Sequence, residues 1–428
     1  MPTPLPHQIA GAQFLASRGK AFLADLPRVG KTAPSVMACD LSNVRRVLVI
    51  TTASNRANFG RDFAEWQALP RKVQVLYKAD EVIRPDTDVL VIGWSVVADR
   101  RLTGRLKAWN AEALILDESH YARTPGAKRC VAAMLLAAQA ERVFCLSGTP
   151  MPNGPHELWP ILSTIAKDRI DNMHYHEFVA RYCRTKSKFV AGKRVDVIVG
   201  GKNLDELRDR LDGFWLRRTQ ADVGIREPLY SMLPLEPTNH PWLQMTDEMQ
   251  EILDAAEAGD TAALQDTHLN KILRLTGTIK APLIADYIAE ELTDGGLDKV
   301  VLMCWHTDVI NWLCARLNEF GVARLDGATT PANRQAAVER FQSERARVFI
   351  GQIQAAGEAI DLSSSCNLIF VEGSWSPKDM GQAALRITNH GQERQCLVRF
   401  AALAGSIDEA VMTVLKRKVA TIKEVLPQ

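Results

Sequence analysis

The stretch Phe22-Leu23-Ala24-Asp25-Leu26-Pro27-Arg28-Val29-Gly30-Lys31-Thr32 decides the fold, because it combines an apolar strand, a turn and the start of a helix. A phosphate-binding loop needs this setting, in which loop amides and the helix N-terminus hold phosphate oxygens. Lys31 is expected to reach the β- and γ-phosphates, and Thr32 to ligate magnesium. Asp25 stands at the first glycine position of the full pattern, so this stretch alone leaves a chance Gly-Lys-Thr open.

A pair of acids supports the loop. Asp117 and Glu118 directly follow the apolar run 113–116, where carboxylates at a strand end can face the same phosphates. We expect Asp117 to hold magnesium through water and Glu118 to orient or deprotonate the attacking water. The alternative is a solvated acidic strand end, which the upstream loop disfavours.

Short β-branched runs alternate with helical patterns in two parts of the chain, which is typical of parallel sheets covered on both faces. The sequence therefore predicts an α/β protein with two parallel-sheet lobes. The runs are 47–50, 89–92, 113–116 and 143–146 in the first part, and 300–303, 348–350, 368–371 and 396–398 in the second.

The length of 428 residues also favours two lobes, because single cores stop growing at about 250 to 300 residues. We expect the first lobe at 1–165 and the second at 276–428. Between them, helical spacing at Leu204, Leu207 and Leu211 and several prolines predict a helical insertion followed by an interlobe linker over 166–275.

Composition excludes several classes of protein. The net charge of +2 does not by itself indicate a polyanion partner, so any nucleic-acid surface must be local. The eight cysteines form no C-x-x-C pair, which favours a reducing cytoplasm without structural zinc. The longest apolar stretch, around 131–140, is too short to span a bilayer, and the N-terminus has no signal pattern, so no membrane association is expected.

The order of motifs resembles that of superfamily 2 helicases, and specifically of the Swi/Snf family of DNA translocases, over nearly the entire chain. The form Gln354-Ala355-Ala356-Gly357 is most similar to the annealing-helicase (HARP-like) branch. The matching segments are 5–8, 25–32, 117–120, 147–153, 157–159, 178–183, 216–219, 325–327 with Arg334 and Phe341, 354–362 and 382–392.

This resemblance implies two RecA-like lobes that close on ATP and Mg²⁺ and reopen on hydrolysis. Gln382 and Arg386 of the last motif would then join Lys31, Asp117 and Glu118 as catalytic residues, with Arg386 as the arginine finger. Asn389 replaces a second arginine of that motif, and Arg28 replaces a family glycine. The residues expected to bind ATP are Gln8, Arg28, Gly30, Lys31, Thr32 and Gly357.

The resemblance also implies double-stranded or forked DNA as the partner, contacted mainly through its phosphates. Gly192 predicts a turn between two short strands in the basic segment 181–202, for which the alternative is a solvated hairpin. The residues expected to contact DNA are Asn55, Arg56, Trp94, Thr149, Lys186, Lys188, Arg194, Thr329 and Gln354.

The sequence thus favours an ATP-dependent translocase on duplex DNA. Two alternatives stay open: a branch-migrating or annealing helicase acting on forks, and an ATP-gated DNA-binding module that hydrolyses poorly. A monomeric motor is expected, with a recruiting protein partner possible. The compact chain suggests a cytoplasmic protein of prokaryotic or phage origin.

Overall fold

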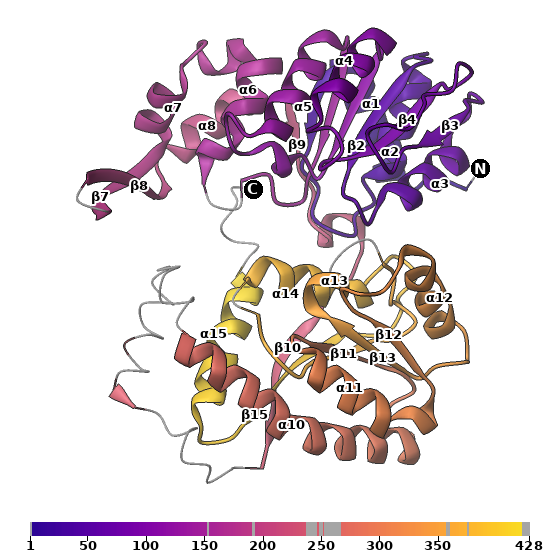
Figure 1. The fold of residues 1–428 in the computed structure, drawn as a ribbon, viewed down its shortest axis with the longest axis vertical. Coiled ribbons are helices and arrows are strands. Elements are labelled where there is room, and N and C mark those ends of the chain that lie inside the picture. Colours follow the sequence, from indigo (N-terminus) through magenta and orange to yellow (C-terminus); the bar gives the residue numbers. More distant parts are fainter. Residues whose placement is uncertain are drawn as a thin grey trace. The chain divides into compact units, whose positions relative to one another are not determined.

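The computed structural model describes residues 2–151, 154–190, 193–236, 246–247, 251, 267–356, 360–374 and 376–421. The chain forms two compact units, which divide between Val223 and Gly224 (Figure 1). The division falls inside the segment 166–275, which was predicted as an insertion and linker. The strand before the division belongs to one sheet, and the strand after it belongs to the other. Each unit is described by itself.

The first unit is built on a seven-stranded sheet in which every pairing is parallel. Its central strands are buried along their whole length, because helices cover both faces. All four apolar runs expected in this part are strands. In sheet order the strands are β3 (Val73–Val75), β4 (Val89–Gly93), β2 (Val47–Thr51), β5 (Ala113–Asp117), β6 (Arg142–Leu146), β1 (Lys20–Leu23) and β9 (Trp215–Leu216).

Alternate residues of the central strands serve the two faces of this sheet. Val47 and Val49 pack in one core with residues of three helices, whereas Leu48 faces the helices on the other side. The first group is α1 (Pro6–Arg18), α2 (Thr32–Leu41) and α3 (Arg56–Trp66), and the second is α4 (Arg100–Trp109) and α5 (Lys128–Gln139).

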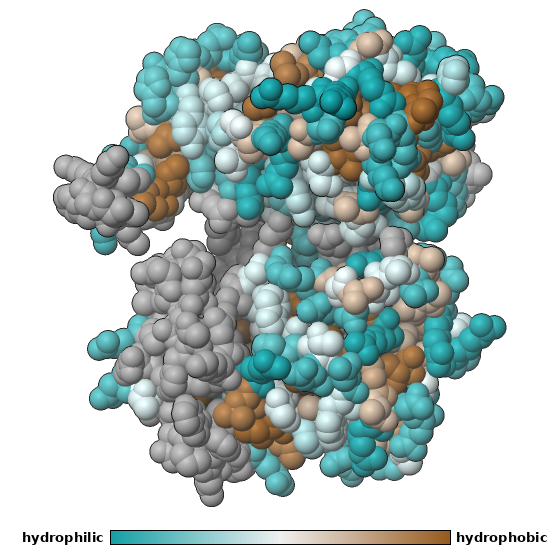
Figure 2. All heavy atoms as spheres, in the orientation of Figure 1, coloured by the Kyte–Doolittle hydropathy of each residue, from teal (hydrophilic) through white to brown (hydrophobic). Residues whose placement is uncertain are grey.

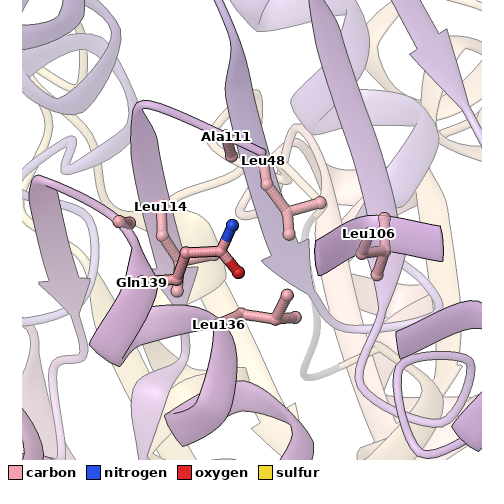
Figure 3. Close-up of a pocket in the computed structure, with 7 residues that line it drawn as sticks. Leu48, Leu106, Ala111, Leu114, Leu136 and Gln139 are labelled. Atoms are coloured by element: carbon pink, nitrogen blue, oxygen red, sulfur yellow. The ribbon is translucent and has the colours of Figure 1, made fainter. Parts of the chain in front are cut away.

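A cavity of about 10 Å³ remains between the sheet and the second group of helices (Figure 3). Leu48, Leu114 and Leu136 line it, and the Gln139 amide at its edge donates to the carbonyl of Lys107. A void of this size accommodates at most one water molecule, so it is a packing defect and not a ligand site.

Beyond β6 the first unit continues as α6 (Trp159–Ile165) and α7 (Tyr175–Tyr182). A hairpin of β7 (Cys183–Val190) and β8 (Lys193–Gly201) follows, and its antiparallel pairing confirms the predicted pair of strands. The leucine spacing is confirmed by α8 (Leu204–Leu211), which leads into β9 at the edge of the sheet.

The second unit has a six-stranded sheet, also parallel throughout, and the four apolar runs expected there are strands. Its strands are, in sheet order, β10 (Leu229–Leu235), β15 (Leu397–Leu403), β14 (Asn367–Phe370), β11 (Val300–Cys304), β13 (Val348–Gln352) and β12 (Val322–Leu325). Its helices are α10 (Thr267–Asp294), α11 (Thr307–Arg316), α12 (Pro331–Gln342), α13 (Ile353–Ala356), α14 (Pro377–Ala384) and α15 (Ile407–Thr421).

A buried ion pair lies in the core of the second unit. Lys280 of α10 donates from Nζ to Asp408 of α15 at 2.9 Å and to the carbonyl of Ala401 at 3.0 Å. Both charged side chains are almost fully buried, so each depends on the other for compensation.

The visible surface of each unit is largely hydrophilic, with small apolar areas (Figure 2). Among the described residues, no helix combines the length and the apolar character that a membrane span requires.

Candidate functional site

The phosphate loop has the expected strand–loop–helix structure, with β1 ending at Leu23 and α2 beginning at Thr32. Gly30 adopts a φ of 88°, and Arg28 a φ of 72°. The family glycine at position 28 is thus replaced by a residue that still takes the left-handed conformation, at a cost of about 1 to 2 kcal/mol.

Asp25 has a structural role that explains its place in the loop. Its side chain is 1% exposed and forms an ion pair with Arg218, which donates from Nε to Asp25 Oδ1 at 3.0 Å and from Nη2 to Oδ2. Arg218 also donates to the carbonyl of His7 in α1. The segment after β9 therefore holds the start of the phosphate loop.

Lys31 points its ammonium group at the loop itself, donating to the carbonyls of Asp25 at 2.8 Å and Leu26 at 3.3 Å. Phosphate oxygens accept stronger, charge-assisted hydrogen bonds than neutral carbonyls do. Gln8 is nearby, because a Cβ atom built on Gly30 would lie 3.0 Å from the Gln8 amide nitrogen. The structure thus brings Gln8, Gly30 and Lys31 together.

The acidic pair lies at the end of β5, as the sequence predicts. Burial, and next the neighbouring Glu118, raise the pKa of Asp117 to about 6, while hydrogen bonds from Thr51 and Asn55 and the charge of Lys31 oppose that rise. Glu118 adopts a left-handed φ of 48°. The phosphate loop and the acidic pair are therefore close enough to interact.

This donor set fits magnesium. Mg²⁺ is commonly held by one or two carboxylates together with substrate phosphates and waters. Asp117 supplies a buried carboxylate whose charged form a cation would favour, and Thr32 supplies a hydroxyl at the start of α2. Across the described parts of the chain, no group of three or more acidic, histidine or cysteine side chains could hold a metal.

The turn after β6 packs against both parts of this site. His120 Nδ1 lies 2.9 Å from Ser147 Oγ and 3.2 Å from Glu118 Oε2. A Cβ atom on Gly148 would lie 2.7 Å from Cδ of Pro27 in the phosphate loop. Gly148 is thus required for a close approach, which goes beyond its role as a turn residue.

Three side chains expected to contact DNA have their polar groups bonded within the unit. Trp94 is 3% exposed, donates from Nε1 to the carbonyl of Asp117 at 2.8 Å and stacks on Tyr121. Arg56 donates to the carbonyls of residues 53, 76 and 77 and lies over the Tyr77 ring. Asn55 donates to Asp117 Oδ2. The polar groups of these side chains are used within the unit, and their expected contact with DNA stays a prediction.

Thr149 follows the Gly148 turn, and its hydroxyl oxygen is buried without a hydrogen-bond partner among the described residues. Its backbone amide donates to Ser147 Oγ at 3.2 Å. This expected DNA contact stays a prediction.

The base of the hairpin is held by Glu206 of α8. Its carboxylate accepts from Arg181 at 2.7 Å, from Arg210 at 2.8 Å and from the Tyr182 hydroxyl at 3.0 Å. These hydrogen bonds, those from the two arginines first, lower the pKa of Glu206 to about 2. Arg181 is therefore paired within the unit.

Farther along the hairpin, Arg184 and Lys186 are exposed basic side chains. Ser187 donates to the carboxylate of Asp196 on the facing strand at 2.6 Å. Lys188 and Arg194 lie in β7 and β8, and their side chains are outside the described part of the structure.

In the second unit, Gln382 lies on α14, and Arg386 lies in the 3₁₀ turn 385–387 that follows. Thr388 is extended, so Asn389 does not lie on a helical face with Arg386, although a spacing of three residues would allow this in a helix. Asn389 instead donates from Nδ2 to the hydroxyl of Ser363. Gly357, expected to bind ATP, lies outside the described residues.

The other expected contacts of this unit follow β12 and β13. The Thr329 hydroxyl is 3.0 Å from Asp326 Oδ1 and accepts from the Asp326 amide, so Thr329 closes its own turn. Gln354 on α13 is exposed. Gln352 links two loops, since it accepts from the Gly327 amide and donates to the Trp305 carbonyl.

The sequence reasoning missed Glu372, a buried carboxylate after β14. It accepts from the amides of Trp305 and His306 at 2.8 and 2.9 Å and lies 2.7 Å from His306 Nδ1. The available signal was an acid directly after a buried apolar strand, the pattern that identified Asp117. Thr51, which bonds Asp117, carried no comparable signal.

The chain is similar to proteins of known activity over almost its whole length. It is 24% identical over 97% of this chain to "DNA annealing helicase and endonuclease ZRANB3" of Bos taurus, covering 40% of that protein. It is 27% identical over 98% of this chain to the "SWI/SNF-related matrix-associated actin-dependent regulator of chromatin subfamily A-like protein 1" of Xenopus tropicalis, covering 44% of that protein. The chain thus spans about two fifths of the length of these relatives, both from animals.

Among solved structures, the "Sulfolobus solfataricus SWI2/SNF2 ATPase core in complex with dsDNA" matches with a TM-score of 0.45 and 19% identity, over 99% of this chain and 93% of that chain. Two family descriptions also match. Residues 284–391 match the helicase conserved C-terminal domain, and residues 7–283 match the SNF2-related domain. Because the second match covers more than half of the sequence, the chain belongs to the SNF2-related family.

Proposed function

We propose that this chain is an ATP-dependent motor that moves along double-stranded DNA. The observation that carries this proposal is that one turn after β6 joins the phosphate loop to the acidic pair within one unit. Its Gly148 lies against Pro27 of the loop that holds Lys31, and its Ser147 bonds His120 beside the buried Asp117 and the half-buried Glu118. A phosphate-binding lysine, a buried carboxylate for Mg²⁺ and a second carboxylate for water are the parts that phosphoryl transfer to water requires.

Each residue has a distinct part in the proposed reaction. The loop amides and Lys31 bind the phosphates, and Thr32 and Asp117 would hold Mg²⁺, which supplies charge neutralisation of the transferring group. Glu118 accepts a proton from the attacking water or orients it. Gln382 and Arg386 of the second unit are proposed as further catalytic residues, with Arg386 as the arginine finger.

Duplex DNA is proposed as the partner because the chain belongs to the SNF2-related family and carries a basic hairpin. Arg184 and Lys186 are exposed there, whereas Arg181 at its base is paired with Glu206. In the first unit, backbone amides and hydroxyls of the loops are proposed as phosphate contacts, because such groups commonly bind DNA phosphates.

A fork-directed annealing or branch-migrating activity is the second candidate. The motif Gln354-Ala355-Ala356-Gly357 favours it, and one of the matched relatives is described as an annealing helicase. The third candidate is an ATP-gated DNA binder, which Asn389 favours, because its amide is bound to Ser363 and carries no charge for the phosphoryl group.

Release of phosphate from ATP, with and without duplex DNA, tests the proposal. A DNA-stimulated rate that Glu118→Gln abolishes is the expected result. ATP hydrolysis that DNA does not stimulate would contradict a DNA motor, and DNA binding without hydrolysis would support the third candidate. Displacement of a triplex-forming strand then measures translocation, and annealing of complementary strands measures the second candidate.

A further inference from the structure

Two neutral donors, one at the end of the neighbouring strand β2 and one in the loop after it, hold the carboxylate of Asp117. Thr51, the last residue of β2, donates from Oγ1 to Asp117 Oδ2 at 2.5 Å. Asn55, just before α3, donates from Nδ2 to the same oxygen at 3.1 Å, and its amide nitrogen lies 3.3 Å from the Thr51 hydroxyl. Oδ2 of Asp117 is therefore fixed by two hydrogen bonds.

Such contacts matter for a carboxylate that would bind a cation. Hydrogen bonds from outer groups fix the orientation of metal-binding side chains, and their removal typically weakens metal affinity by about 10- to 100-fold. Thr51 is fully buried, and Trp94 holds the backbone carbonyl of the same aspartate. The position of Asp117 is thus determined by residues that follow both β2 and β4.

Asn55 also belongs to the loop 52–55, which enters α3. Its backbone amide donates to the Thr52 carbonyl at 3.2 Å, and its carbonyl accepts from the Phe59 amide at 2.8 Å in the first turn of α3. Thr52 and Ser54 have hydroxyls 3.1 Å apart in the same loop. A shift of this loop therefore moves the Asn55 amide relative to Asp117.

We propose that Asn55 is a positioning residue of the nucleotide site, and that it transmits the binding of DNA phosphates by the loop 52–55 to Asp117. Loop amides and hydroxyls contact the DNA, while the Asn55 side chain stays on Asp117 and adjusts the carboxylate that holds Mg²⁺. The inference rests on the proposed function. It gives the chain a short physical path from DNA to catalysis within one unit.

Reciprocity follows from such a path. If DNA binding changes the affinity for Mg²⁺–nucleotide by some factor, Mg²⁺–nucleotide must change the affinity for DNA by the same factor. Removal of the Asn55 side-chain amide breaks the connection. The factor by which DNA and Mg²⁺–nucleotide change each other's affinity then moves toward one. Nucleotide binding without Mg²⁺ does not depend on the connection.

The experiment is equilibrium binding of a fluorescent, non-hydrolysable ATP analogue to the full chain, in Mg²⁺ and in EDTA, with and without duplex DNA. Asn55→Ala and Thr51→Val should weaken binding in Mg²⁺ about 10- to 100-fold and leave binding in EDTA unchanged. Thr51→Ser keeps the hydroxyl and should bind like the wild type. Thermal unfolding of each variant shows whether it is folded.

The outcomes separate the possibilities. Asn55→Ala should keep the DNA affinity measured without nucleotide and lose the coupling factor. A weakened DNA affinity with unchanged Mg²⁺ dependence would return Asn55 to the DNA surface and overturn the inference. Weakened Mg²⁺–nucleotide binding with an unchanged coupling factor would refute the proposed transmission from DNA to Asp117. If the wild type binds no DNA, the proposed function fails, while the positioning role is still decided by the Mg²⁺ and EDTA titrations.

Discussion

Arg218 holds the carboxylate of Asp25 with both Nε and Nη2. This ion pair joins the segment after β9 to Asp25, which stands at the first glycine position of the phosphate-loop pattern. The Asp25 side chain is 1% exposed and that of Arg218 is 14% exposed. Loss of one partner leaves the other charge buried, which typically costs about 3 to 5 kcal/mol.

Arg218→Ala is therefore expected to lower the unfolding free energy of the first unit by about 3 to 5 kcal/mol, measured by urea denaturation. The matched control is Arg208→Ala on α8, where the pair with Asp205 is exposed and contributes at most about 1 kcal/mol. Equal effects of the two substitutions would show that the ion pair does not hold the loop.

Lys31 and Glu118 should separate binding from hydrolysis. Lys31→Ala should weaken ATP binding, because it removes the charge at the phosphates, whereas Glu118→Gln should preserve binding and stop phosphate release. The matched control is Glu112→Gln, since Glu112 accepts from the amide of Arg45 away from the loop. Wild-type turnover in either site variant would remove this assignment.

Gly148→Ala should damage the site through the close approach to Pro27. The added methyl group would lie 2.7 Å from a rigid ring carbon, so the phosphate loop must shift, at about 1 to 3 kcal/mol, and nucleotide affinity should fall. Gly104→Ala on α4 is the control, because its methyl group meets nothing within 4 Å. That control should gain about 0.5 to 1 kcal/mol from helix propensity. Unchanged nucleotide binding in Gly148→Ala would contradict the tight contact.

The hairpin should contribute to DNA affinity through charge. Reversal of Lys186, Lys188, Lys193 and Arg194 to Glu should weaken duplex binding, and the log–log salt slope should fall by about 0.9 for each phosphate that the hairpin no longer neutralises. DNA-free nucleotide binding should be intact. Reversal of Arg100, Arg101, Lys107 and Lys128, all exposed on α4 and α5, is the control of equal charge. Similar reductions of affinity in both sets would indicate a general charge effect and a solvated hairpin.

Arg386→Ala should lose on the order of 10³ in single-turnover hydrolysis on saturating DNA, about 4 kcal/mol of transition-state stabilisation. Asn389→Arg should not raise turnover, because residue 389 follows an extended Thr388 and its side chain points to Ser363. Arg394→Ala, which removes an exposed pair with Asp298, is the control. If Arg386→Ala hydrolyses ATP as fast as the wild type, another residue is the finger.

The sequence predicted the eight apolar strands, the leucine-spaced helix and the hairpin turn, because each of these depends on neighbouring residues. Periodicity and turn chemistry act over a few positions and can be read from one chain. It also predicted Lys31, Asp117 and Glu118, since a phosphate loop and an acid after a buried strand are local patterns. The strands β3, β9, β10 and β12 lack such a pattern and were missed.

Tertiary structure alone decided which partners the polar groups of Asn55, Arg56 and Trp94 bond. Asn55, Arg56 and Trp94 have the residue types of DNA contacts, but parallel pairing of β2 with β4 and β5 brings their loops to the edge that holds Asp117. Buried donors and acceptors need partners, and Asn55 and Trp94 supply them to Asp117 at this edge. The sequence by itself thus determined the strands, the phosphate loop and the acidic pair, whereas the partners of Asp25, Asp117 and Glu206 depended on residues brought together from distant parts of the chain.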